Sequence, residues 1–243
     1  PENPPTRLGV SGMDSTTGIF AALGTMLALY HRDKTGEGQL VDACLIDSAV
    51  FFMETYIAEY KMTKHFRPRM GNAHPYTAPS DSFKAKDGYF YVQTAGSSIW
   101  KRLVKFMGKE ELLTDPGFRN DFERAKPRGR QFFTDWFNNW AADKTLDEVV
   151  NLLNNAGVPC APINSIPQVA ADPHIQAREM LPEVEHPGIG KIPLIGIPIK
   201  MSRTPGKIKT TYPAIGQHNE EIYCGRLGFT SQQLAKLKED GVI

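Results

Sequence analysis

The sequence predicts a mixed α/β protein, and three observations carry this prediction. Apolar residues recur at intervals of three and four over residues 19–30, which is the period of a helix with one buried face. Two β-prone runs at 81–85 and 89–93 flank an Asp-Gly turn, which is the pattern of a β-hairpin. From residue 157 the chain is rich in proline and β-branched residues, which favours short strands and turns.

Composition places the chain among soluble globular proteins. Its 243 residues are 41% hydrophobic and 23% charged, enough to form a core in one large domain or two small ones. The net charge is +1 without a lysine and arginine cluster, so we expect no nucleic-acid partner. The longest apolar run, 43–53, is interrupted by Asp47 and is too short to span a membrane.

Cysteine and histidine usage argues against a metal or disulfide framework. The three cysteines, Cys44, Cys160 and Cys224, are odd in number and widely spaced, as in a protein of the reducing cytoplasm. The six histidines include no i,i+4 pair, and neither a phosphate-binding nor a dinucleotide-binding glycine motif occurs. We therefore predict no metal, no permanently bound cofactor and a cytoplasmic location.

The first helix begins beside a carboxylate, Asp14. One interpretation makes Asp14 an N-cap, because aspartate accepts hydrogen bonds from the free amides of a first helical turn. The other makes it a covalent nucleophile toward an activated acyl group, since a helix N-terminus favours an ionised carboxylate. Gly18 and Gly24 interrupt the helix and suggest a close approach of another backbone or a ligand. A glycine turn at 35–38 then leads into a short strand at 39–42.

Residues 45–62 predict one long helix that is apolar on most sides and therefore buried in a core or a subunit interface. The following segment, 65–76, contains two prolines and a Gly-Asn pair, which predicts a loop. Helices are expected at 97–107, 118–125, 128–142 and 145–156. The aromatic stripe of the third of these is expected in the core, and it comprises Phe132, Phe133, Trp136, Phe137 and Trp140.

The remaining elements are shorter. Thr145 and Glu148 form a capping box that starts a helix, and 158–163 is β-like. We expect short helices around 172–180, strands through Val184, Ile192, Ile195 and Ile199, and closing helices at 217–227 and 231–240, the last capped by Ser231.

Several motifs together resemble those of the class III CoA-transferases, the CaiB/BaiF family. The segment Asp14-Ser15-Thr16-Thr17-Gly18 precedes an Ala/Leu-rich helix, then His-Arg-Asp-Lys-Thr-Gly-Glu-Gly-Gln and Val-Asp. The resemblance covers nearly the whole chain. Further motifs in the family's order are Pro68-Arg69-Met70-Gly71-Asn72, Asp87-Gly88-Tyr89, Gly157-Val158-Pro159-Cys160-Ala161-Pro162, Asp172-Pro173, Gly216-Gln217, Leu227-Gly228 and Gly241-Val242-Ile243.

The resemblance implies roles for particular residues. Asp14 stands where the family has its nucleophile, and Leu45 and Arg69 are expected to contact coenzyme A. His74 and Tyr76 are expected on the substrate side of a loop that Gly71 and Asn72 shape. The formyl-CoA and oxalate enzymes carry a glycine run there, whereas this chain has Ala73-His74-Pro75-Tyr76, which is stiffer and argues against those substrates.

The resemblance also implies an architecture. Residues 1–62 and 160–243 would belong to a large open-sheet, Rossmann-like domain, incomplete because the family's proteins are longer and their N-terminal half precedes this chain. Residues 63–159 would form a smaller α+β domain that contains the hairpin. Family members form dimers of interlocked chains, so an interlocked homodimer is expected.

The implied reaction moves coenzyme A from an acyl-CoA to a small carboxylic acid through an aspartyl mixed anhydride and an aspartyl-CoA thioester, with coenzyme A as the carrier substrate. An α-methylacyl-CoA racemase of the same superfamily is one alternative, because its aspartate works with a histidine that would precede residue 1. A non-catalytic interaction fragment is the other.

Overall fold

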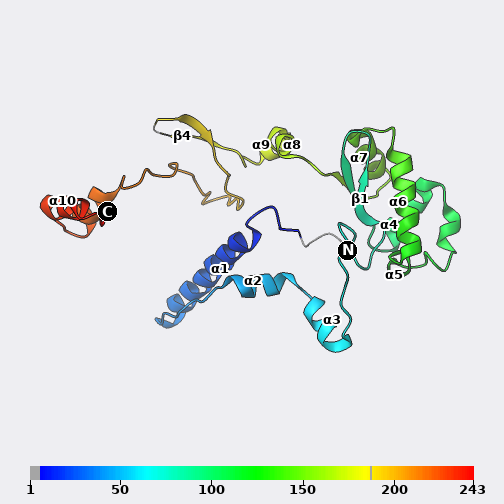
Figure 1. The fold of residues 1–243 in the computed structure, drawn as a ribbon, viewed down its shortest axis with the longest axis horizontal. Helices are drawn as coiled ribbons and strands as arrows, with labels where there is room; N and C mark the ends of the chain where they lie inside the picture. The colour runs from blue at the N-terminus through cyan, green and yellow to red at the C-terminus, as the bar shows by residue number, and fades with distance from the viewer. Residues whose placement is uncertain (1–5, 187) are drawn as a thin grey trace. The chain divides into compact units, whose positions relative to one another are not determined.

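The structure is a computed structural model that describes residues 6–186 and 188–243. It confirms the mixed α/β class, with helices and two small antiparallel sheets. The chain divides into two compact units, one ending at Pro162 and one running from Ile163 to Ile243 (Figure 1). The division expected from sequence, at 62/63 and 159/160, stays a prediction. No helix in the described part of the chain has the length and apolar character that a bilayer span requires.

Three helices open the first unit: α1 (Gly12–Thr35), α2 (Leu45–Phe52) and α3 (Tyr56–Thr63). The single long helix expected over 45–62 is wrong, because the chain breaks between Phe52 and Tyr56. Glu54 has a φ of 47° there, in the left-handed region that a helix cannot continue through. Neither glycine nor proline marks this break in the sequence.

The segment that joins α1 to α2 is not a strand. Gln39–Asp42 was expected to be one, but it belongs to neither sheet, and a strand needs a hydrogen-bonded neighbour. It passes close to α1 instead, since a Cβ added to Gly24 would lie 2.7 Å from Val41 Cγ1. The close neighbour of Gly24 is therefore a side chain and not the backbone or ligand that the sequence suggested, and nothing lies within 4 Å of a Cβ at Gly18.

The hairpin is confirmed as β1 (Ser80–Lys84) and β2 (Tyr89–Gln93), paired antiparallel. Its Asp-Gly turn contacts the start of a later helix, because Asp87 Oδ1 accepts a hydrogen bond of 2.8 Å from the Leu146 amide. A Cβ on Gly88 would lie 2.6 Å from Leu146 Cδ1. The strand β3 (Cys160–Pro162) pairs with β2, so this sheet extends to the end of the first unit.

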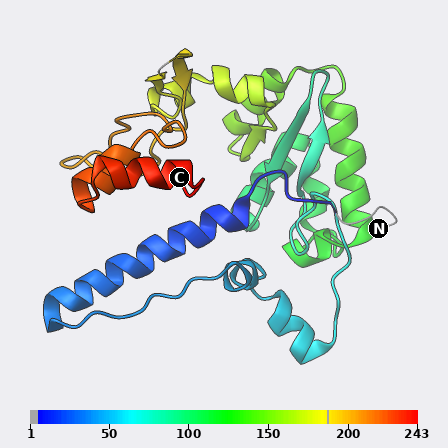
Figure 2. The same ribbon diagram turned by 60° about the vertical axis from the view of Figure 1, so that its left-hand side comes forward.

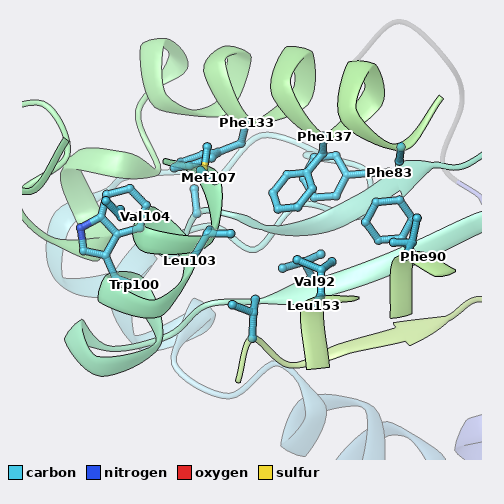
Figure 3. Packing of buried hydrophobic residues seen from close by; sticks show 14 of the residues in the cluster. Phe83, Phe90, Val92, Trp100, Leu103, Val104, Met107, Phe133, Phe137 and Leu153 are labelled. Carbon is cyan, nitrogen blue, oxygen red and sulfur yellow. The ribbon is translucent and has the colours of Figure 1, made fainter. Parts of the chain in front are cut away.

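Helices cover the sheet and enclose the core. They are α4 (Ser97–Met107), η1 (Glu110–Leu113), α5 (Asp121–Arg124), α6 (Pro127–Ala141) and α7 (Leu146–Asn155). The long helix α6 runs alongside β1 of the hairpin (Figure 2). Phe137 of α6 is fully buried and stacks on Phe83 of β1, with 4.5 Å between ring centroids (Figure 3). The expected aromatic stripe is therefore core, and the Thr145 capping box is present with both of its hydrogen bonds.

Burial changes the chemistry of Cys160 in β3, raising the pKa of its thiol to about 12. Because only the thiolate is nucleophilic, we expect iodoacetamide at pH 8 to alkylate Cys160 about 100-fold or more slowly than glutathione. Peptide mass spectrometry over time measures this rate, and denaturation in urea should restore ordinary reactivity. Native alkylation as fast as that of glutathione would contradict the burial.

The second unit contains α8 (Ile166–Ala171), α9 (Pro173–Ala177), β4 (Glu183–His186), β5 (Gly190–Pro193), η2 (Glu220–Arg226) and α10 (Ser231–Glu239). Three expectations are wrong in detail. Ile195 and Ile199 lie outside the strands, and the cap of α10 is Thr230, whose side chain accepts from the Gln233 amide. The helix expected at 217–227 is shorter and is wound as a π-helix.

Candidate active site

Asp14 lies in the first turn of α1 without capping it. The helix begins at Gly12, and the cap position falls on Ser11, whose side chain makes no capping bond. The N-cap interpretation of Asp14 is therefore wrong. Its carboxylate is exposed and has no hydrogen-bond or ion-pair partner within residues 6–186 and 188–243. Because no interaction has to be broken before it attacks, an exposed carboxylate of this kind is available as a nucleophile.

The start of α2 packs against the same part of α1. Thr17 Oγ1 lies 2.7 Å from Ser48 Oγ, and the rings of Phe20 and Phe51 meet edge to face with centroids 5.3 Å apart. Leu45, the expected contact for coenzyme A, is the first residue of α2 and is 52% exposed. Contacts between the two helices thus join the segments that carry Asp14 and Leu45.

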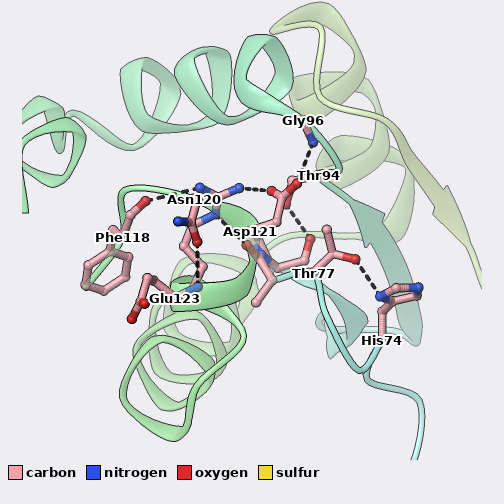
Figure 4. Close-up of polar contacts among 11 residues, drawn as sticks. His74, Thr77, Thr94, Gly96, Phe118, Asn120, Asp121 and Glu123 are labelled. Carbon is pink, nitrogen blue, oxygen red and sulfur yellow. Dashed lines mark hydrogen bonds and ion pairs between the residues drawn. The ribbon is translucent and has the colours of Figure 1, made fainter. Parts of the chain in front are cut away.

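The loop expected on the substrate side is ordered by its own histidine. His74 Nδ1 accepts a hydrogen bond of 3.2 Å from the Tyr76 amide and lies 2.5 Å from Thr77 Oγ1 (Figure 4). An amide can only donate, so in the neutral ring Nδ1 is the acceptor and the proton sits on Nε2. The imidazole is exposed, and its Nε2–H takes no hydrogen-bond partner from the described residues. This loop therefore presents a donor of fixed orientation.

Two arginines hold the backbone around this loop. Arg130 donates to the carbonyl oxygens of His74 and Pro75, at 2.7 and 3.1 Å. Arg124, 1% exposed, donates to the Ala78 carbonyl at 2.9 Å and pairs with Asp121. A buried guanidinium is stable only when its N–H groups donate hydrogen bonds. The bonds from Arg124 and Arg130 therefore attach the backbone of this loop to the core.

A third cluster ties the loop to α3. The Tyr76 hydroxyl donates to Glu59, 2.9 Å from Oε2 and 3.0 Å from Oε1. Glu59 also pairs with Arg67, whose guanidinium lies between the rings of Tyr56 and Tyr76, at 4.1 and 4.3 Å. Hydrogen bonds from Arg67 and then from Tyr76 lower the pKa of Glu59, while burial and the Glu59 contact raise the pKa of Tyr76. Tyr76 is thus largely engaged within the protein.

Other expected site residues lie near this loop. Gly71 has a φ of 65°, which favours glycine, and Asn72 donates from Nδ2 to Ser82 Oγ at 2.8 Å. Arg69 is exposed. Met53 and Phe66 contribute to an apolar hollow of about 670 Å³, which residues of α3 and Arg67 also line.

The expected site residues form two groups. His74, Tyr76, Gly71 and Asn72 lie together on the loop, and Asp14 lies on α1 near α2. No hydrogen bond or ion pair among the described residues joins Asp14 to the loop. Sequence reasoning missed the side chains that hold these groups, which are Thr17, Ser48, Glu59, Arg67, Arg124 and Arg130, because no short motif marks their long-range contacts. Within the described chain, no three His, Cys, Asp or Glu residues could hold a metal ion.

Comparison of the fold with solved structures defines the class. A CAIB/BAIF family protein from Brucella suis superimposes with a TM-score of 0.72 at 28% identity, over 93% of this chain and 58% of that one. The sequence model of CoA-transferase family III matches residues 1–219. The chain belongs to CoA-transferase family III, which confirms the resemblance found in its motifs.

Two curated relatives illustrate the family. The chain is 37% identical over its whole length to a succinyl-CoA–D-citramalate CoA-transferase from Chloroflexus aurantiacus, covering 60% of that protein. It is 31% identical over its whole length to a formyl-CoA:oxalate CoA-transferase from Streptomyces avermitilis, covering 62% of it. The chain thus spans about 60% of the length of these relatives.

Proposed function

We propose that the natural protein transfers coenzyme A between an acyl-CoA and a carboxylic acid, with Asp14 as the covalent nucleophile. The observation that carries the proposal is the exposed, unpartnered carboxylate in the first turn of α1, within a segment matched by the family model. A carboxylate engaged in a salt bridge would be a poorer nucleophile, because attack would have to break that interaction.

The reaction balances with this chain's carboxylate and its substrates alone. An Asp14 oxygen attacks the thioester carbonyl, the C–S bond breaks, and the CoA thiolate leaves a mixed anhydride. The thiolate then attacks the aspartyl carbonyl and releases the donor acid, leaving an aspartyl-CoA thioester. The acceptor carboxylate attacks this thioester, the C–S bond breaks, and a second mixed anhydride forms as the CoA thiolate leaves. The thiolate then attacks the acyl carbonyl of the acceptor, which gives the new acyl-CoA and frees the Asp14 carboxylate. Exclusion of water protects both intermediates from hydrolysis.

The loop and α2 supply binding groups in this proposal. The outward Nε2–H of His74 donates to an oxygen of the substrate acid, and Gly71 and Asn72 shape the turn. Tyr76 contacts the substrate through its exposed edge while its hydroxyl stays on Glu59. Leu45 and Arg69, both exposed, contact coenzyme A.

A partner surface is part of the proposal. The three N-terminal helices expose large apolar side chains that would be covered in an interlocked homodimer and by the remaining strands of an open-sheet domain. They include Ile19, Leu23, Met26, Leu27, Tyr30, Ile46, Phe51 and Phe52. Ile46 and Phe51, for example, are 68% and 67% exposed. A stable folded protein seldom leaves a whole face of apolar side chains exposed to water.

Succinyl-CoA is the first donor to test, because a relative 37% identical is named for it and the His-Pro-Tyr loop departs from a glycine run. The natural protein is incubated with succinyl-CoA and a panel of carboxylic acids, and new CoA esters are separated chromatographically. Hydroxylamine then traps an activated Asp14 as a hydroxamate in the corresponding peptide. New CoA esters together with the trapped peptide support transfer. Deuterium uptake at the α-carbon without trapping supports a racemase, and neither result indicates a non-catalytic fragment.

Two substitutions at His74 separate its two nitrogens. Asparagine can keep an acceptor near Nδ1 but loses the outward donor, so His74→Asn should raise KM for the acceptor acid about tenfold, the effect of one lost hydrogen bond. Glutamine keeps a donor near Nε2 and loses the inner acceptor, so His74→Gln should retain more acid affinity. Steady-state kinetics measure both values. The same KM for the acid in His74→Asn and wild type would contradict the donor role.

A further inference from the structure

One buried hydroxyl stands out in the N-terminal helices. Ser48 is 3% exposed and is the single fully buried residue between 6 and 70. A hydroxyl taken out of water needs a hydrogen-bond partner, since an unpaired buried hydroxyl destabilises the fold. Its nearest partner is Thr17 Oγ1 at 2.7 Å, on the other helix.

The hydrogen atoms available decide how these bonds are arranged. Thr17 Oγ1 lies 2.8 Å from the Met13 carbonyl oxygen, and Ser48 Oγ lies 3.2 Å from the Cys44 carbonyl oxygen. Each hydroxyl donates only one hydrogen. The three hydrogen bonds therefore cannot all form at once, and the hydroxyl that donates to the other one gives up its bond to a carbonyl oxygen. The shorter distance favours Ser48 donating to Thr17 and Thr17 donating to Met13.

This chain of hydrogen bonds ends at the peptide group that carries Asp14. The Met13 carbonyl belongs to the peptide bond between Met13 and Asp14, and Thr17 follows Asp14 by three residues on the same side of the helix. At the other end, Cys44 immediately precedes Leu45. The hydroxyl pair therefore fixes the first turn of α1 against the start of α2.

We propose that Thr17 and Ser48 are positioning residues for Asp14, which hold its turn in the orientation needed for attack on the thioester. This inference rests on the proposed function and deepens it. Neither hydroxyl touches the substrate. Misplacing a reacting group by about 1 Å can cost a rate factor of about 100, so loss of the pair slows formation of the covalent intermediate more than it weakens binding.

The same helix offers a matched control. Thr25 Oγ1 makes an equivalent bond of 2.8 Å to the Ala21 carbonyl, but Thr25 is exposed and its hydroxyl has no partner on α2 among the described residues. Thr25→Val thus removes a hydroxyl and a local helical bond without touching the contact between the helices. Thr17→Val removes the same groups and the contact.

The experiment compares Thr17→Val, Ser48→Ala, Thr17→Ser and Thr25→Val in the natural protein, with succinyl-CoA as donor. Rapid quenching with hydroxylamine gives the single-turnover rate of activated Asp14, and steady-state assays give KM. We expect a fall of about 10- to 100-fold in this rate for Thr17→Val and Ser48→Ala, with KM for the donor within about twofold. Thr17→Ser, which restores the hydroxyl, and Thr25→Val should match the wild type.

Several outcomes would overturn the inference. They are a wild-type single-turnover rate in Thr17→Val and Ser48→Ala, an equal loss in Thr25→Val, or a change confined to KM. If Thr17→Val does not fold by circular dichroism, Ser48→Ala decides, because it leaves the bond from Thr17 to Met13 in place. If the wild type forms no activated Asp14, the proposed function and the inference fail together, whereas unaffected variants of an active wild type refute the inference alone.

Discussion

Replacing Asp14 with asparagine is expected to lower the rate of CoA transfer by about 1000-fold or more, the usual scale for loss of a covalent nucleophile. The amide has nearly the same shape but cannot form the anhydride. The fold should persist, because Asp14 does not cap α1 and makes no hydrogen bond or ion pair to another described residue. Only its interaction with the helix dipole is lost, about 0.3–1 kcal/mol. CoA-ester analysis measures the rate, and circular dichroism the fold.

The control is Asp33→Asn, which removes an exposed carboxylate from the last turn of the same helix. It should retain the wild-type transfer rate. Hydroxylamine trapping adds a second criterion, because the hydroxamate should disappear from the Asp14 peptide in the first variant and remain in the second. Turnover of Asp14→Asn at the wild-type rate would end the proposal of a covalent mechanism through Asp14.

Replacing Phe137 with alanine is expected to lower the free energy of unfolding by about 3–5 kcal/mol. Phe137 is fully buried and its ring contacts those of Phe83, Phe90 and Trp136, so truncation leaves a cavity inside the first unit. Urea unfolding followed by tryptophan fluorescence measures the change. All three tryptophans of the chain lie in this core or packed against it, so the signal reports this unit.

Phe122→Ala is the matched control, since Phe122 is 59% exposed and precedes α6 by only a few residues. A surface substitution of this kind should change stability by no more than about 0.5 kcal/mol. Equal losses in the two variants would show that Phe137 is not part of a closely packed core.

Elements formed by local contacts could be predicted from the sequence. The hairpin at 80–93 and the capping box at Thr145 depend on residues a few positions apart, and the structure confirms both. The stripe around Phe137 was predictable because a period of 3.6 residues places those side chains on one face. The family could be predicted for a similar reason, since its motifs are short and occur in order.

Features that depend on distant partners could not be predicted. Residues 39–42 follow a glycine turn and include Val41, which suggested a strand, but a strand forms only beside another one. The helix break at Glu54 contains neither glycine nor proline, and the apolar pattern continues across it. Nothing in the sequence therefore indicates that the helix ends there. The interpretation of Asp14 as the N-cap of α1 is three positions off, because the helix begins earlier, at Gly12, and its cap position is Ser11. The run Asp-Ser-Thr-Thr offers several residues that commonly cap helices, so the sequence does not decide among them.

The residues of the candidate site show the same difference between local and distant contacts. Asp14 and His74 were indicated by resemblance, and their chemistry could be stated from residue type alone. Glu59 and Arg67 form an ion pair although they are eight positions apart, on either side of the end of α3. The hydrogen bond from Tyr76 to Glu59 likewise forms only when the chain is folded. The Thr17–Ser48 pair spans 31 positions, and threonine or serine in a helix ordinarily bonds only to its own preceding turn.

The apolar helices at the start of the chain have a thermodynamic consequence. Most helical stability in proteins comes from packing, and a short isolated helix in water is marginal. Because α1 to α3 bury so little against the other described residues, a partner that covers them acts as a ligand of the folded state, and in the proposed homodimer mass action would link their order to subunit concentration. Dilution of that proposed dimer would unfold these helices first, while the aromatic core between Ser80 and Pro162 would keep a midpoint independent of concentration.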